Sequence, residues 1–271
     1  MPSQVFFIAM SSYKQIFQPF GKSSKAIFYA LSAGTLVLFV LFWHFTTSSG
    51  LIPKPLVVIK SFFSIIQTHD FIEHLFKSLG LTFEAMFFSI VIALIIGYLS
   101  VIPVFAPIAR FIVKCRYLTI TGLYFIFILL TKDADQLKLS LLIFGIVPFF
   151  LTSIVSIIAC ISVDEYDSCR TLGFTKWETL YEIIIIGRLD QVLEVIRQNF
   201  AIAWMMIVTV ESSALSGGGI GALLFRYNKY NDLPNVLALQ IVILLIGILM
   251  DQLLAKMRKE LFPYTQITAA E

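Results

Sequence analysis

The chain has 271 residues, of which 58% are hydrophobic and only 14% are charged, and its formal net charge is +3. An ordinary soluble domain carries roughly 25% charged residues, so this composition excludes most soluble folds and favours a helical protein that crosses a bilayer several times. Lysine and arginine lie at the ends of apolar runs and not in one basic patch, which argues against a nucleic-acid partner.

Six apolar segments are candidate membrane spans, because a helix needs about 20 mainly apolar residues to cross the hydrocarbon. The first two are residues 26–45 and about 79–104, and Glu84 is the only charged residue of the second. The third, residues 117–131, is short for a span and requires snorkelling side chains or burial within a bundle. The remaining three follow at about residues 139–161, 192–215 and 233–255.

The distribution of positive charge predicts the orientation of these spans. If the amino terminus is inside, thirteen lysine and arginine residues lie on the inner side and seven on the outer side. This bias predicts that both termini are cytoplasmic. We therefore expect a cytoplasmic or interfacial segment at residues 1–25, a membrane domain at residues 26–260 and a cytoplasmic tail at residues 261–271.

The stretch "ISVDEYDSCRTLGFTKWETLYE", residues 161–182, interrupts this apolar pattern between the fourth and fifth spans. Ser162 precedes Glu165 by three residues, and Thr175 precedes Glu178 by three residues. In each pair the hydroxyl and the carboxylate can satisfy the free amides of a helix start, which is the capping-box pattern. Residues 162–182 are therefore predicted to form two short helices, and we call them the helix-pair segment.

Gly173 lies between the two predicted helices and suits the left-handed conformation that ends a helix. Leu172 and Phe174 flank it and are expected to hold the turn against an apolar surface. Trp177, Leu180, Tyr181 and Ile184 follow at helical spacing on one face, which predicts a buried face. Two interpretations remain: a long loop that happens to be helical, or a rigid element that docks a partner and transmits force to the adjacent spans.

The helix-pair segment resembles the cytoplasmic coupling motif of ABC-importer permeases. The resemblance lies in Glu165, Arg170, Leu172, Gly173 and Trp177, followed by the run of isoleucines at residues 183–186. It extends to "LIPKP" at 51–55, "HLFKSLGLTF" at 74–83, Glu211 followed by "GGGIGALL", and "LLIGILMDQLLAKMRKELFPY" near the end. These stretches are similar to the nitrate, sulfonate, taurine and bicarbonate branch of these permeases, over roughly residues 26–264.

The sequence departs from that family's pattern at three places. Tyr166 and Asp167 stand where small residues usually follow the glutamate, and Gly187 stands where the family has a proline. The third span lacks the proline-rich sequence, with its tryptophan and phenylalanine-glycine pair, that is usual in that branch.

The resemblance implies an all-α membrane protein of the type I ABC-importer permease fold, with the coupling segment at residues 162–187. It implies that Glu165 and Glu178 fix the helix starts, and that Leu172, Phe174 and Trp177 contact a cytosolic ATPase. The implied partners are two ATPase subunits, a second copy of the permease and an external solute-binding protein. This chain contains no glycine-rich loop ending in Gly-Lys-Ser or Gly-Lys-Thr, so ATP and Mg²⁺ are expected in the partner ATPase and no cofactor in this chain.

Glu211, at the outer end of the fifth span, has two interpretations. An ionisable group at this depth is often functional, and here it would bond to backbone amides or close a gate. Alternatively, it is a carboxylate at a helix end that the external loop keeps wet. Trp204, Met205 and Ser212 are further candidates to line a translocation path, although tryptophan and methionine in a span more often serve helix packing.

Two weaker patterns have structural explanations that we prefer. Residues 216–221, "SGGGIG", lack the strand and the lysine of a phosphate-binding loop, and are expected to form a tight turn or re-entrant loop. His69, Asp70, Glu73 and His74 contain potential zinc ligands, but their spacing matches no strong zinc pattern and suits the start of an amphipathic helix.

An alternative function is transport driven by an ion gradient, with Glu84 and Glu211 as the proton-linked groups. That class predicts internal repeats and charges at the bilayer midplane, and neither is evident in the sequence. An intramembrane enzyme is a third class, for which the sequence offers no catalytic arrangement of serine, histidine and aspartate.

Overall fold

The computed structural model describes residues 25–47 and 53–263, and the chain divides into two units, residues 1–60 and 61–271. In the first unit, α2 spans Lys25–Thr46 and coincides with the predicted first span. Almost all of the predicted segment 1–25 and most of the predicted tail 261–271 lie outside the described residues. The helix α3, Pro55–Gln67, was not among the predicted segments and leads into the second unit.

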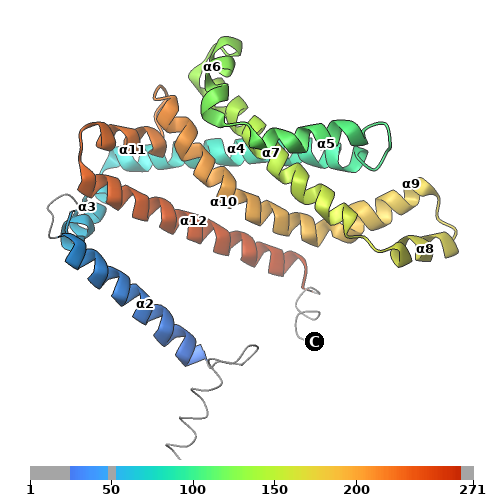
Figure 1. Cartoon of the computed structure of the whole chain (residues 1–271), viewed down its shortest axis with the longest axis horizontal. Coiled ribbons are helices and arrows are strands. Elements are labelled where there is room, and N and C mark those ends of the chain that lie inside the picture. The colour runs from blue at the N-terminus through green and yellow to red at the C-terminus, as the bar shows by residue number, and fades with distance from the viewer. Residues whose placement is uncertain (1–24, 48–52, 264–271) are drawn as a thin grey trace, which may run out of the picture. The chain divides into compact units, whose positions relative to one another are not determined.

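The second unit is entirely helical in the part that the structure describes (Figure 1). Among the described residues, four helical stretches are long and apolar enough to cross a membrane. They are α4 (His69–Leu99), α7 (Ala134–Ala159), the continuous stretch Lys176–Ser213 that ends in α10 (Leu189–Ser213), and α12 (Leu233–Leu261). These four confirm the predicted second, fourth, fifth and sixth spans, although α4 begins ten residues before the predicted start.

The chain turns after α4 because proline follows. The helix ends at Leu99, residues 100–105 form turns, and Pro103 lies within them. Proline lacks the amide that an α-helix interior requires and disfavours helical geometry in the residue before it. The second span is therefore shorter at this end than the predicted limit of residue 104.

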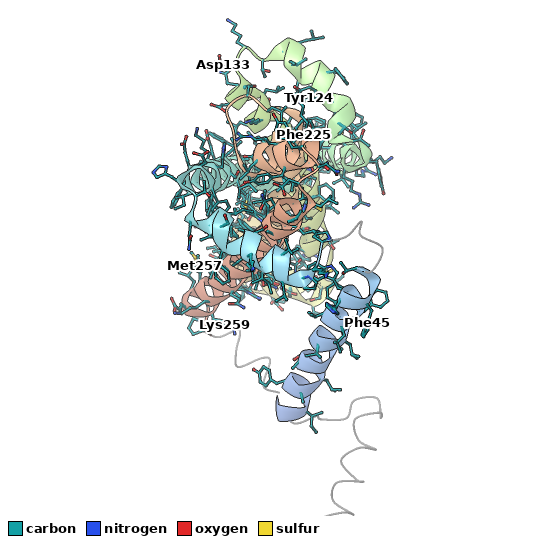
Figure 2. The ribbon with its side chains drawn as sticks, turned by 90° about the vertical axis from the view of Figure 1, so that its left-hand side faces the viewer. Phe45, Tyr124, Asp133, Phe225, Met257 and Lys259 are labelled. Atoms are coloured by element: carbon teal, nitrogen blue, oxygen red, sulfur yellow. The ribbon has the colours of Figure 1, made fainter. Side chains whose placement is uncertain are left out.

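The predicted third span is not a straight helix. The structure has a bent pair in this region, with α5 (Ala106–Lys114) and η2 (Cys115–Tyr117) on one side and α6 (Ile120–Leu130) on the other, at an angle of 111°. The break falls at Leu118 and Thr119, whose backbones are extended. Figure 2 shows Tyr124 on α6 and Asp133 at the approach to α7. The pair counts as a fifth span if its two helices cross the membrane together.

The helices α4, α7 and α10 contact one another and form the core. On α4, Ala85, Ser89 and Ala93 follow at four-residue spacing and are fully buried. Gly97 continues this row, and the position of its absent Cβ lies against Ile154 of α7. Small side chains let helix backbones approach closely, which is the usual way in which membrane helices pack.

Large apolar side chains cover the outer surface of this bundle. Phe76, Phe83, Phe87 and Ile95 of α4 are all exposed. An exposed apolar surface of this extent is unfavourable in water and marks a lipid or protein contact. The composition, the helix lengths and this surface agree on a multi-pass membrane protein.

Candidate functional site

Both predicted capping boxes are present in the helix-pair segment. At the start of α8 (Val163–Thr171), the Glu165 amide donates to Ser162 Oγ at 3.3 Å, and the Ser162 amide donates to Glu165 Oε1 at 3.4 Å. At the start of α9 (Lys176–Thr179), the Glu178 amide donates to Thr175 Oγ1 at 3.3 Å, and the Thr175 amide donates to Glu178 Oε2 at 2.7 Å. Each short helix therefore has two amides at its start satisfied locally.

The turn between α8 and α9 has the geometry expected for Gly173. Its φ is +80°, and no atom lies within 4 Å of the position of a Cβ. The Gly173 amide donates to the Arg170 carbonyl, and the Phe174 amide donates to the Cys169 carbonyl, each at 3.1 Å. This pair of bonds is a Schellman motif, which ends a helix with a residue in the left-handed conformation. The turn thus fixes the angle between the two helices.

Arg188, whose sequence position indicates only a contribution to the charge bias, clamps the helix-pair segment to the next helix. Its Nη2 lies 2.7 Å from Glu165 Oε1 and 2.6 Å from Oε2. Arg188 belongs to η4 (Ile186–Arg188), directly before α10. Partial desolvation of the Glu165 carboxylate opposes its ionisation, but the hydrogen bonds from Arg188 and Ser162 outweigh this and lower its pKa.

An apolar cluster holds the other side of the segment. It consists of Ile161, Cys169, Ile183 and Ile184, all buried, and partly buried side chains pack against it. Burial of apolar side chains of this size contributes roughly 1.5–3 kcal/mol each. The side chains that pack against this cluster are Tyr98, Ile158, Tyr166 and Leu180. Tyr166, one of the departures from the family pattern, thus has a packing role.

The far end of the segment has no such cover. Leu172 and Trp177 are 72% and 70% exposed, and Phe174 is 38% exposed. Arg170 is also exposed and forms a loose 3.7 Å ion pair with Asp167. The predicted buried face of the second helix is correct only toward Ile184, because Trp177 and Tyr181 are exposed. The helix-pair segment therefore presents apolar side chains at its tip.

The second helix of the pair continues into α10 without a break. After α9 come the π-helical η3 (Leu180–Ile185), η4 and α10, which together form one helical stretch of 38 residues. At 1.5 Å per residue this stretch is roughly 57 Å long, which exceeds the roughly 30 Å of bilayer hydrocarbon. Figure 1 shows α8 and α9 at one end of α10 and α11 (Ile220–Lys229) at its other end.

Glu211 lies in the last turns of α10 and is only 1% exposed. Ser78 Oγ of α4 lies 2.7 and 2.8 Å from its two carboxylate oxygens, and the Gly221 amide donates to Oε2 at 2.8 Å. Ser78 Oγ also accepts from the Ile220 amide at 2.8 Å. The interpretation of Glu211 as a wet carboxylate is therefore wrong, and its predicted bonding to a backbone amide is confirmed.

The glycine loop, residues 214–219, is attached to two further helices near Glu211. Lys138 of α7, itself buried, donates to the Gly218 carbonyl at 2.9 Å. His74 Nδ1 of α4 accepts from the Gly219 amide at 2.9 Å. Gly219 has a φ of +115°, and a Cβ there would collide with the Glu211 carboxylate. The loop is a tight connection between α10 and α11, in agreement with the expectation for residues 216–221.

The other candidate path residues do not share one surface with Glu211. Trp204 is 5% exposed, stacks on Phe200 with ring centroids 6.3 Å apart, and donates from Nε1 to the Ile243 carbonyl at 3.0 Å. Trp204 therefore packs α10 against α12. Met205 is exposed and lines an open groove of about 620 Å³ between these two helices. Ser212 Oγ donates to a carbonyl of its own helix.

Two charged residues of the fifth span, Glu194 and Arg197, are paired within a network between α10 and α12. Arg197 donates to Glu194 at 2.6 Å and to Asp251 at 2.6 Å, and Arg258 donates to Glu194 at 2.7 Å. Charges within a span are tolerated when they pair inside the bundle. Sequence spacing reveals the Glu194 and Arg197 pair, but the partners on α12 lie more than fifty residues away.

The zinc interpretation of residues 69–74 gains no support. Within the described residues, no three histidine, cysteine, aspartate or glutamate side chains gather as metal ligands. Glu73 pairs with Lys77 at 2.8 Å, and His74 contacts the glycine loop.

Comparison with known proteins places the chain among transport proteins. Residues 86–261 match the family described as binding-protein-dependent transport system inner membrane component. Probable ABC transporter permease proteins of Brucella melitensis biotype 1 and Brucella abortus strain 2308 are each 23% identical over 225 residues. These matches cover 78% of this chain, and 87% and 86% of the two relatives.

Two solved structures contain chains with a similar fold. One is a crystal structure of an amino acid ABC transporter, with a TM-score of 0.60, 18% identity and coverage of 74% of this chain and 96% of that chain. The other is a bacterial alginate ABC transporter in complex with a periplasmic protein that binds an alginate pentasaccharide. Its TM-score is 0.54 at 13% identity, with coverage of 87% and 94%.

The helices and their membrane-spanning segments have the type I permease fold. The chain belongs to the family of binding-protein-dependent transport system inner membrane components, as a permease subunit of an ABC importer.

Proposed function

We propose that the helix-pair segment receives a cytosolic ABC ATPase and passes its ATP-driven movement along α9 and α10 into the membrane. The observation that carries this proposal is the exposed apolar tip at Leu172 and Trp177, together with the continuation of α9 into a span. The capping boxes and the clamp between Glu165 and Arg188 make the tip rigid relative to α10. Because the connection is rigid, a change in the conformation of the ATPase shifts the equilibrium between two conformations of the membrane spans.

The assembly that follows from this proposal contains two copies of the permease, two ATPase subunits and an external solute-binding protein. ATP and Mg²⁺ bind to the ATPase subunits, and the helix-pair segment and both termini face the cytoplasm. The membrane domain, residues 26–260, forms the translocation path. From the resemblance to the nitrate, sulfonate, taurine and bicarbonate branch, the solute is a small anion.

The ion-gradient alternative receives less support from the geometry. Glu84 is exposed on α4, whereas Glu211 is buried and hydrogen-bonded to Ser78 and Gly221. The two carboxylates therefore do not form one site that could bind and release protons along a translocation path.

Removal of the apolar tip tests the coupling proposal. The double variant Leu172→Ala with Trp177→Ala should lose co-purification of the ATPase, because the side chains removed are exposed and contribute little to folding. Tyr230→Ala is the matched control, since Tyr230 is 74% exposed but lies beyond α11, at the other end of α10. The proposal is contradicted if the double variant co-purifies with as much ATPase as the control does.

A change at Gly173 tests whether the turn must be rigid. Gly173→Val should abolish transport and coupled ATPase activity while membrane insertion is unchanged, because a β-branched residue strongly disfavours a φ of +80°. Gly173→Asn is the control, since asparagine tolerates this conformation, and it should retain most of the transport. Normal transport by the valine variant would refute the assigned role of the turn.

A further inference from the structure

A pocket of about 240 Å³ lies at the bend between η2 and α6, where residues of α7 and α10 complete its wall. We call it the bend pocket. Gly145 of α7 lies in its wall, and two side chains meet there. Ile120 at the start of α6 and Met206 of α10 lie 3.1 and 3.3 Å from the position of the absent Gly145 Cβ. The bend therefore packs against Gly145, and Figure 1 shows α6 turned away from the direction of α5.

The bend pocket lies near the middle of the membrane thickness. Gly145 is the twelfth of the 26 residues of α7, so it lies about 17 Å from one end of this helix and about 21 Å from the other. The hydrocarbon of a bilayer is roughly 30 Å thick. A polar group in this pocket is therefore far from both membrane surfaces.

The bend exposes polar backbone at this depth. Leu118 and Thr119 are extended and exposed, and in the described chain the Thr119 side chain forms no capping bond to α6. The first amides of a helix have no partner within that helix. Non-helical backbone at membrane depth is tolerated only inside protein or beside a water-filled cavity, because lipid chains cannot bond to it. The exposed side of the bend therefore does not face lipid.

Arg116 brings an unpaired positive charge to the bend pocket. Its side chain is exposed and has no ion-pair partner among the described residues. Its Nη2 donates to the Tyr117 hydroxyl at 2.9 Å, and its guanidinium carbon lies 5.0 Å from the centre of the Tyr117 ring. These contacts orient the guanidinium but leave its charge uncompensated. The sequence has no aspartate or glutamate between Glu84 and Asp133.

A charge at this depth needs a reason, because charged side chains within the hydrocarbon are costly and usually functional. Arginine near a helix end often extends its side chain to the membrane surface. Half of the hydrocarbon thickness is roughly 15 Å, which exceeds the reach of that side chain from the middle of a span. A water-filled surrounding and an anionic ligand remain as the ways to stabilise Arg116.

The other groups in the bend pocket suit a small oxyanion. Thr121 of α6 and Thr209 of α10 line it beside Arg116, and none of the described residues that line it is aspartate or glutamate. A guanidinium presents several donors in one plane that match two oxygens of an anion, and hydroxyl groups can donate further bonds. The rest of the wall is mainly apolar, as at Phe144 and Met206. An apolar wall with a few convergent polar groups is typical of small-molecule sites.

We propose that the bend pocket is the point in the translocation path where the permease binds its solute, and that Arg116 holds the anionic group of that solute. Thr121 and Thr209 donate to the remaining oxygens. The single guanidinium favours an oxyanion with one negative charge. This inference rests on the proposed function, which supplies the path and the small anion, and it adds the residue that recognises the charge.

The first test asks whether the bend faces water. The complete transporter, with its ATPase subunits, is placed in phosphatidylcholine vesicles after replacement of its three cysteines by serine. Leu118→Cys should react with sulfonatoethyl methanethiosulfonate at least about tenfold faster than Phe87→Cys, because a thiol in lipid does not ionise. Phe87 is the matched control, since it is 64% exposed near the middle of α4 and does not line the pocket. Equal rates overturn the proposal.

The second test measures the charge of Arg116. The rate of the anionic reagent at Leu118→Cys is divided by the rate of the cationic reagent trimethylammonioethyl methanethiosulfonate. Arg116→Gln should lower this ratio about tenfold or more, whereas Arg116→Lys should retain most of it. Lys114→Gln is the control and should change the ratio less than about threefold, since Lys114 is exposed two residues away but does not line the pocket. An unchanged ratio in Arg116→Gln overturns the proposal.

The third test identifies the ligand by protection of the same thiol in the absence of ATP. Nitrate, bicarbonate and methanesulfonate are added separately to Leu118→Cys. At least one of them should slow the reaction, at a concentration about tenfold lower with Arg116 than with Arg116→Gln. Protection by none of the three, or equal slowing of Phe87→Cys as a general effect of salt, overturns the proposal. Failure of the unaltered chain to co-purify with the ATPase would instead overturn the proposed function.

Discussion

The two ends of the stretch Lys176–Ser213 are built in opposite ways. At the helix-pair segment the capping bonds join residues three apart, and apolar side chains such as Trp177 are exposed. At the glycine loop the bonds join residues far apart in sequence, and Glu211 is almost completely buried. The first end is a rigid tip that leaves its apolar surface free for a partner. The second end holds a loop against the bundle through Ser78, Lys138 and Glu211, whose polar groups are already bonded inside the chain.

Two glycines with positive φ sharpen this comparison, and we expect the largest effect there. Gly219→Ala should lower the free energy of unfolding by several kcal/mol, because the added Cβ collides with Glu211 and disturbs the bonds of Glu211 to Ser78 and Gly221. Each buried polar group that is left unpaired costs about 1–3 kcal/mol. Gly173→Ala should cost only about 1–2 kcal/mol of conformational strain, since its surroundings are empty. Thermal unfolding in detergent measures both, and equal losses would show that the two ends are not different.

The clamp at Arg188 is expected to have a smaller effect. Arg188→Gln should reduce the protection of α8 by about 1 kcal/mol, because the pair with Glu165 is only partly shielded from water. This corresponds to roughly fivefold faster amide hydrogen exchange at residues 163–171, measured on the isolated chain. Arg170→Gln is the control, since the Arg170 side chain is 81% exposed and its ion pair is loose. Equal exchange rates in the two variants would show that Arg188 does not fix α8.

The smallest expected effect is a dependence on pH at the same place. Because the folded-state pKa of Glu165 is lowered, its stabilisation is present above the unfolded pKa of about 4.3 and is lost as the pH falls through the folded value. The protection factor of residues 163–171, which compares their exchange rate with that of the unfolded chain at the same pH, should therefore fall below about pH 4.3. In Arg188→Gln the pKa is closer to the unfolded value, so less protection remains to be lost over this range. Identical pH profiles for the variant and the unaltered chain would contradict the assigned cause.

The sequence predicts the helix-pair segment well because its determinants are local. Each capping box joins residues three apart, and the conformation of Gly173 follows from its place between two helix signals. Periodicity and length likewise predicted four of the spans, since an apolar stretch of sufficient length has few alternatives in a membrane.

The remaining features depend on contacts that no short pattern contains. Ser78 and Glu211 are 133 residues apart, and Lys138 and Gly218 are 80 residues apart, so the buried network could not be read from spacing. The bend near Thr119 has no proline or glycine at the break itself. Arg188 was counted as a charge that sets topology, and only the structure brings it to Glu165.

The π-helical turn at Leu180–Ile185 has a consequence for comparing this chain with its relatives. Such a turn contains one residue more than the α-helix it replaces, so losing a single residue there would restore α-helical winding and keep the helix continuous. Relatives can therefore differ by one residue at this place and still join the tip to the span. Alignments of the family should allow a single-residue gap between Thr179 and Ile186 before they equate positions on the two sides.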